Sequence, residues 1–130
     1  MSQFISRADA ICKQLLDSAG RVPMPSADPE ALSAGDLPGV STYLNAVVPL
    51  AKRALARIGA LGEPATNSGA VRRLLDQLHA SANSEADAAR AAGRGDLAGF
   101  RVAFHKAEAD NQAAADQAHR LGLQVCGQGG

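Results

Sequence analysis

Residues 95–122 read GDLAGFRVAFHKAEADNQAAADQAHRLG, and this stretch decides the fold class. Its apolar residues recur at spacings of three and four, which is the period of one face of an α-helix. Asp96 is placed to cap the start of that helix, and Gly122 is placed to end it. The pattern predicts a helix over 97–121 whose inward positions are Leu97, Phe100, Phe104, Ala107, Asn111, Ala114, Ala118 and Leu121.

Asn111 is the single polar residue in that inward series. A polar side chain in the seam of a bundle often sets the register of the packed helices. A slightly different rotation of the helix would instead expose Asn111, and a third reading gives it a contact with a ligand. The sequence leaves these three interpretations open.

Three further helices are predicted over 3–19, 37–61 and 68–92. Ser2 is expected to cap the first of them, with Gly20 in the left-handed conformation just past its end. Helix 37–61 opens with GDLPGV, much as helix 97–121 opens with GDLAGF, and Asp36 is the expected cap. The distance from Asp36 to Gly62 equals that from Asp96 to Gly122. This match suggests two similar helical hairpins, although Asp caps and Gly stops are common enough to coincide by chance.

Composition points to the same class. The chain has 130 residues, of which 46% are hydrophobic and only 3% aromatic, so Ala, Leu and Val supply most of its apolar surface. Pro49 falls inside helix 37–61, where it either kinks the helix or splits it in two. A short GRG link joins the last two helices. We therefore predict an all-α, four-helix up-down-up-down bundle that forms a single domain over residues 1–130.

The charges exclude one class of partner. Thirteen basic and thirteen acidic residues cancel, and neither sign is clustered as a phosphate backbone requires, so we expect no nucleic-acid partner. No apolar stretch is long enough to cross a membrane. We expect a soluble monomer or homodimer.

The two cysteines, Cys12 and Cys126, stand near opposite ends of the chain. In this topology the last helix ends at the pole where the first begins, and Cys12 lies roughly 14 Å from that pole. An extended run from Gly122 to Cys126 covers about 13 Å, so the tail reaches Cys12. A disulfide is the favoured reading; the alternative is two unrelated thiols, one half-buried and one on a frayed tail.

The residues before Cys126 fit a returning tail. Leu121, Leu123 and Val125 alternate with Gly122 and Gln124, which is typical of an extended segment with one buried face. Only GQGG at 127–130 is expected to be loose. Disulfides persist in oxidising compartments, so a bridge would place the protein outside the cytoplasm.

Several short motifs carry a resemblance. FISRADAICKQ at 4–14, the GDL openings at 35–37 and 95–97, and LGLQVCG at 121–127 resemble small exported Ala-rich bundle proteins of high-GC bacteria. That family is similar to envelope lipoproteins or membrane-anchored ectodomains, mostly without an assigned function. The resemblance implies that Cys12 pairs with Cys126, and it implies no catalytic residues. The start MSQFISRADAICK has no signal peptide, lipobox or anchor, so a membrane tether would lie outside the given sequence.

The histidines offer a candidate metal site. His105 and Glu108 are one helical turn apart, and His119 lies on nearly the same face. Ferritin-like bundles use Glu-x-x-His on two helices, whereas this chain has only the reversed HKAE. His105, Glu108 and His119 are therefore the metal-ligand candidates of an alternative function, a metal- or haem-binding bundle in transport or redox.

The connection between the first two helices is the candidate interaction surface. It is long, rich in proline and carries Met24, and its candidate residues are Val22, Pro23, Met24 and Pro25. Long loops in compact domains are often functional. With no catalytic motif present, we expect a non-enzymatic binding or interaction domain of the bacterial envelope. It would need no cofactor, and its partner would be a protein or a small molecule.

Overall fold

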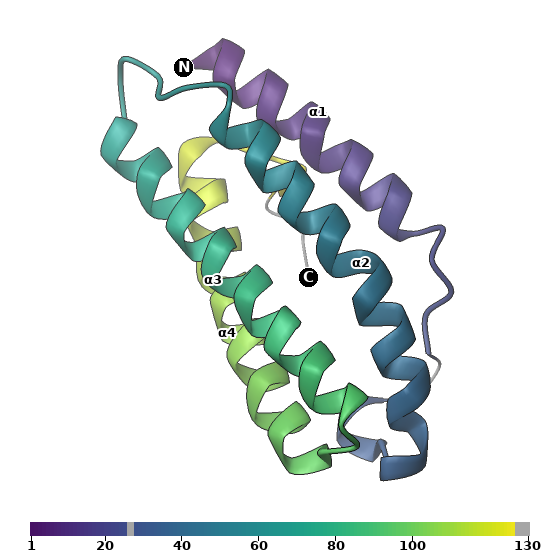
Figure 1. Cartoon of the computed structure of the whole chain (residues 1–130). Helices are drawn as coiled ribbons and strands as arrows, with labels where there is room; N and C mark the ends of the chain where they lie inside the picture. The colour runs from purple at the N-terminus through teal and green to yellow at the C-terminus, as the bar shows by residue number, and fades with distance from the viewer. Residues whose placement is uncertain (26–27, 127–130) are drawn as a thin grey trace.

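The structure, a computed structural model, describes residues 1–25 and 28–126 (Figure 1). The described residues form four α-helices and no strand, and the helices are α1 (Ser2–Ala19), α2 (Leu37–Gly59), α3 (Ser68–Gly93) and α4 (Leu97–Leu121). Two short 3-10 turns, η1 (Pro29–Ala31) and η2 (Ala34–Asp36), lie between α1 and α2. The helices run alternately down and up in Figure 1, which confirms the predicted all-α bundle.

The prediction for α4 is confirmed at both ends. The Asp96 carboxylate accepts a hydrogen bond from the Gly99 N–H at 2.9 Å, and Gly122 follows the helix with φ +90°. At α1 the prediction is wrong in two details. Met1, not Ser2, precedes the helix, and Gly20 has a right-handed φ of −64°. Gly20 stays right-handed because its N–H continues the helical pattern to the Leu16 carbonyl.

Asp36 does not cap α2 as predicted. Its carboxylate accepts the Ser33 N–H at 2.8 Å and so closes a capping box around η2. The helix α2 then begins without a side-chain cap and ends at Gly59, before the predicted stop at Gly62. It is continuous through Pro49, so the split alternative is wrong. The matched Asp–Gly spacing therefore does not correspond to two helices with matching ends.

The hydrophobic core forms two separate clusters. The upper core lies toward the end of the bundle that holds the N-terminus; its buried members are Phe4, Ala8, Ile11, Cys12, Ala54, Ile58, Val71, Leu74, Ala114, Ala118, Leu123 and Cys126. The lower core lies at the opposite end; its buried members are Leu32, Leu37, Val40, Ala88, Ala91, Ala92 and Phe100. The inward positions predicted for α4 all lie on its buried or half-buried face.

The helices do not contact one another equally. The helices α3 and α4 pack along most of their length, α2 packs on α3, and α1 packs mainly on α2. In Figure 1 the segment after α4 runs back between α1 and α4. There Leu123, with 1% of its surface exposed, joins the upper core. The C-terminal tail thus completes the packing between the first and last helices.

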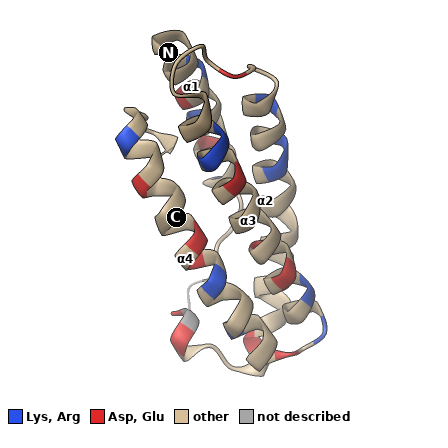
Figure 2. Ribbon diagram, turned by 90° about the vertical axis from the view of Figure 1, so that its left-hand side faces the viewer, with Lys and Arg blue, Asp and Glu red and all other residues tan. Residues whose placement is uncertain are grey.

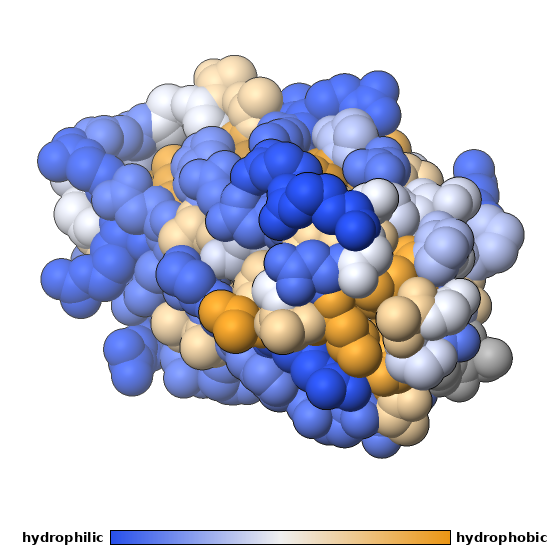
Figure 3. Space-filling view, turned by 60° about the horizontal axis from the view of Figure 1, so that its bottom comes forward, coloured by the Kyte–Doolittle hydropathy of each residue, from blue (hydrophilic) through white to orange (hydrophobic). Residues whose placement is uncertain are grey.

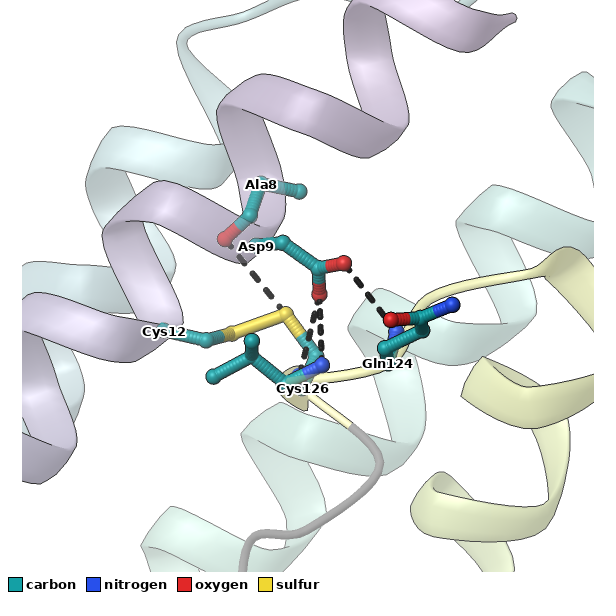
Figure 4. The surroundings of a disulfide bond; sticks show 6 residues. Ala8, Asp9, Cys12, Gln124 and Cys126 are labelled. Atoms are coloured by element: carbon teal, nitrogen blue, oxygen red, sulfur yellow. Dashed lines mark hydrogen bonds between the residues drawn. A yellow bond between two sulfur atoms is a disulfide. The ribbon is translucent and has the colours of Figure 1, made fainter.

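The predicted disulfide is present and fastens this tail (Figure 4). Cys12 and Cys126 are joined with a Cα–Cα distance of 5.2 Å, within the usual range for a disulfide. Leu123 and Cys126 are buried and Val125 is half-buried, while Gly122 and Gln124 are exposed. The predicted alternation of burial is confirmed. The expectation of a loose GQGG falls on residues 127–130, outside the described part of the chain.

The tail is not extended, however, and the reason is Asp9 on α1. Its carboxylate accepts hydrogen bonds from three successive backbone N–H groups, those of Gln124 at 3.0 Å, Val125 at 3.0 Å and Cys126 at 3.1 Å. In an extended strand successive N–H groups point to opposite sides, so the backbone must bend for all three to reach one side chain (Figure 4). Asp9 and the disulfide both hold residues 124–126 of the tail against α1.

Charged side chains of both signs are interspersed along the ribbon (Figure 2). Among the described residues, no helix is long and apolar enough to span a membrane.

Candidate functional site

A cavity of about 500 Å³, partly open to the surface, lies between the helices. It borders the upper core at Cys12, Ala54 and Ile58 and the lower core at Leu32 and Val40, so it separates the two. Small-molecule sites in proteins have volumes of about 300–1,000 Å³. The remaining apolar lining residues are Leu15, Leu16, Ala19, Met24, Pro25, Leu44, Val47, Ala51, Leu55, Leu78, Ala82, Ala88, Phe104, Ala107 and Cys126.

Small inward residues account for this space. The helices α2, α3 and α4 all place alanines on its wall, among them Ala51, Ala82 and Ala107. One and two turns of α4 toward the lower core, the inward residues are Phe104 and Phe100 instead. Protein interiors otherwise pack at a density of about 0.75. Alanine side chains fill less volume than Leu or Phe at the same positions would, which leaves space between the helices.

Three polar side chains on α3 and α4 form a network on the cavity wall. The Ser81 hydroxyl lies 2.6 Å from Asn111 Oδ1 and 3.4 Å from Glu85 Oε1. The Asn111 amide donates to the same Glu85 oxygen at 3.5 Å. All three residues line the cavity. Asn111 is therefore not solvent-exposed: it is half-buried, joins α4 to α3 through these hydrogen bonds, and lines the cavity.

Glu85 is the ionisable group most affected by its surroundings. Burial raises the pKa of its carboxyl above the ordinary value, and the hydrogen bonds from Asn111 and Ser81 lower that pKa in part. Desolvation disfavours the charged form of a carboxyl group, which explains the direction of the shift. Ionised Glu85 thus costs the folded state some stability.

We expect Glu85→Gln to raise the thermal unfolding midpoint at neutral pH. A group whose pKa is higher in the folded state contributes stability below its unfolded pKa and loses that contribution as pH rises through the folded pKa. The gain over wild type should therefore shrink as the pH falls through the raised folded pKa of Glu85 and should be lost below about 4.3, the ordinary pKa of Glu. Thermal melts across this pH range measure it. Glu63→Gln, at an exposed residue paired with Arg72, should give no gain, and an equal gain in both variants would contradict the assignment to Glu85.

The predicted interaction loop forms part of the cavity rim. Met24, with 72% of its surface exposed, and half-buried Pro25 both line the cavity, whereas Val22 and Pro23 do not. Figure 3 looks toward the lower end of the molecule and shows hydrophobic side chains exposed among hydrophilic ones. Two of the four candidate loop residues thus border the cavity, and the other two lie outside its lining.

Two contacts hold the far part of this loop against α4. His105 Nε2 lies 3.1 Å from a Glu30 carboxylate oxygen, and the Arg101 guanidinium donates to the Leu32 carbonyl at 3.1 Å. The loop thus crosses the lower end of the bundle between α1 and α2 and is attached to the last helix on the way.

The metal-ligand candidates come together only in part. His105 Nδ1 lies 3.3 Å from a Glu108 oxygen, but His119 is fourteen residues further along α4, about 21 Å by helical rise. His79, His105 and His119 are all exposed. Within residues 1–25 and 28–126, no cluster of three or more His, Cys, Asp or Glu side chains is arranged to hold a metal ion. The proposed triad is therefore not assembled.

Comparisons with protein-family models, curated proteins and solved structures gave no match to this chain.

Sequence reasoning missed Ser81, Glu85 and Tyr43, all of which line the cavity. A signal for the first two was present. Continuing the spacing of three and four from Leu74 and Leu78 along α3 leads to Ser81 and then to Glu85. Two polar residues on an otherwise apolar helix face, level with Asn111 on the partner helix, mark a polar site within the core.

Proposed function

We propose that this chain is a non-enzymatic binding domain that encloses an apolar small molecule within its helical bundle. The cavity of about 500 Å³ carries the proposal. Its lining is mostly apolar, and apolar surface left in contact with water is unfavourable, so a ligand that covers it gains free energy. Its few polar groups suit the orientation of a ligand, which is the usual composition of such sites.

We also propose that the protein works outside the cytoplasm, at the bacterial envelope. The disulfide supports this location, because such bonds persist in oxidising compartments and are rare where thiols are kept reduced.

The alternative of a metal- or haem-binding bundle has no specific support. Both cysteines are used in the disulfide, and His105, one of the metal-ligand candidates, is exposed and contacts Glu30 and Glu108.

Ala107→Leu tests the binding proposal. The added side chain enters the cavity, so we expect affinity for the neutral fluorophore N-phenyl-1-naphthylamine to fall by about tenfold or more. Since cavity filling removes unfavourable space, the same variant should gain about 0.5–2 kcal/mol in stability. Fluorescence titration and chemical denaturation measure the two effects.

Ala109→Leu is the matched control, because residue 109 is exposed on the same helix and is absent from the cavity lining. It should bind the probe as wild type does. Wild-type protein that shows no saturable binding, or folded Ala107→Leu protein that binds as well as wild type, would refute a ligand-binding interior.

A further inference from the structure

Among the described residues, the cavity lining contains acidic side chains but no basic ones. Its acidic groups are Glu85 and Glu108, and no Lys, Arg or His is among the lining residues of the described chain. The basic side chains nearby in α4 contact carboxylates other than that of Glu85. Lys106 pairs with Asp110 at 3.1 Å, and His105 contacts Glu30 and Glu108. Nothing in the cavity wall balances the negative charge of Glu85.

The Glu85 carboxylate can accept further hydrogen bonds or an ion pair. Ser81 and Asn111 approach only its Oε1 atom, and within the described residues Oε2 forms no hydrogen bond and Glu85 forms no salt bridge. A carboxylate in weakly hydrated surroundings interacts strongly with an added charge, because the local dielectric constant is low. A cationic group entering the cavity would be attracted, and a second carboxylate would be repelled.

Two aromatic side chains favour the same kind of ligand. Tyr43 on α2 and Phe104 on α4 line the cavity together with Glu85. Aromatic ring faces attract organic cations, and ammonium-binding sites in proteins use this property. The cavity therefore combines a carboxylate and aromatic rings with long apolar walls.

From this juxtaposition we infer that the site selects a cationic amphiphile, an alkyl chain bearing an ammonium head group that pairs with Glu85. The inference rests on the proposed ligand-binding function and narrows it to one chemical class. The alkyl chain contacts the Ala, Leu and Val side chains of the wall. Asn111 and Ser81 act as positioning residues that hold the carboxylate toward the head group.

Three ligands of equal chain length test the inference: decyltrimethylammonium, decanol and decanoate, each displacing N-phenyl-1-naphthylamine below its micelle concentration. We expect the ammonium compound to bind about tenfold more tightly than decanoate, with decanol between them. In Glu85→Gln protein the ratio of ammonium to decanol affinity should fall to about one, because the amide carries no charge. Glu63→Gln, which removes an exposed charge outside the cavity lining, should keep the wild-type ratio.

The outcomes separate this inference from the proposed function. Equal affinities for the three ligands, tighter binding of decanoate, or an unchanged ratio in Glu85→Gln would overturn the cationic preference while leaving an apolar binding site. Failure of wild-type protein to bind the probe or any of the three ligands would overturn the proposed function itself. Circular dichroism at each ligand concentration verifies that the bundle stays folded during the titration.

Discussion

Replacing both bridging cysteines, Cys12→Ser with Cys126→Ser, is expected to lower the free energy of unfolding by about 4–5 kcal/mol. The two cysteines are separated by 114 positions, so the bridge closes nearly the whole chain into one loop. Such a link removes much of the conformational freedom of the unfolded state. A domain is typically stable by only about 5–15 kcal/mol, so this single bond accounts for a large share of its stability. Denaturant titration measures the change, and the thermal midpoint should fall by roughly 10–20 °C.

Reduction of the wild-type protein should reproduce most of this loss, which separates the effect of the bond from that of the two serines. A loss below about 1 kcal/mol in both experiments would contradict the expected contribution. Two free thiols in freshly purified, unreduced protein would show that the bridge does not form.

Asp9→Ala is expected to cost about 2–4 kcal/mol, the second largest effect. The Asp9 carboxylate accepts hydrogen bonds from three backbone N–H groups of the tail. Hydrogen bonds to a charged group are stronger than neutral ones, and a donor left without a partner in partly buried surroundings keeps its desolvation cost. The substitution should also loosen the tail, which hydrogen exchange of the amides of residues 124–126 would detect.

Asp9→Asn should recover only part of the loss. Its amide keeps one accepting oxygen, but the new NH₂ group faces an N–H that it cannot accept. Asp17→Ala is the control, because Asp17 is an exposed acidic residue on the same helix, and its removal should change stability by less than about 0.5 kcal/mol. Equal stability of the Asp9→Ala and Asp17→Ala variants would show that the tail does not depend on the Asp9 carboxylate.

The spacing of apolar residues was sufficient to predict the four helices. The spacing of Leu97, Phe100, Phe104 and Ala107 placed α4 to the residue, because a helix with one apolar face leaves that period in its sequence. The exceptions at Gly20 and Asp36 are local. A glycine after a helix can adopt a left- or a right-handed conformation, and an aspartate can cap either of two adjacent helices. The hydrogen bonds of the neighbouring backbone determine which of these occurs. Asp36 serves η2 because Ser33 lies within its reach.

The candidate site could be predicted only in part. Asn111 stood out as a polar residue among apolar ones, and Met24 stood out in a long loop, and both line the cavity. The metal-ligand triad was wrong as a set because shared helix face does not mean proximity. His119 lies several turns from His105 along the helix.

The sequence by itself determined the four helices, their inward faces and the reach of the tail to Cys12, because each depends on local spacing and on the fixed rise of a helix. Only the tertiary structure revealed the cavity and the polar network on its wall. Whether small side chains leave a gap depends on the summed volume of residues facing each other from several helices, and no spacing within one helix records that sum. The role of Asp9 was decided in the same way. The accepting carboxylate lies on α1, whereas the first donating N–H, that of Gln124, is 115 positions later in the sequence. The bend of the tail therefore depends on a contact between the two ends of the chain, which local spacing does not reveal.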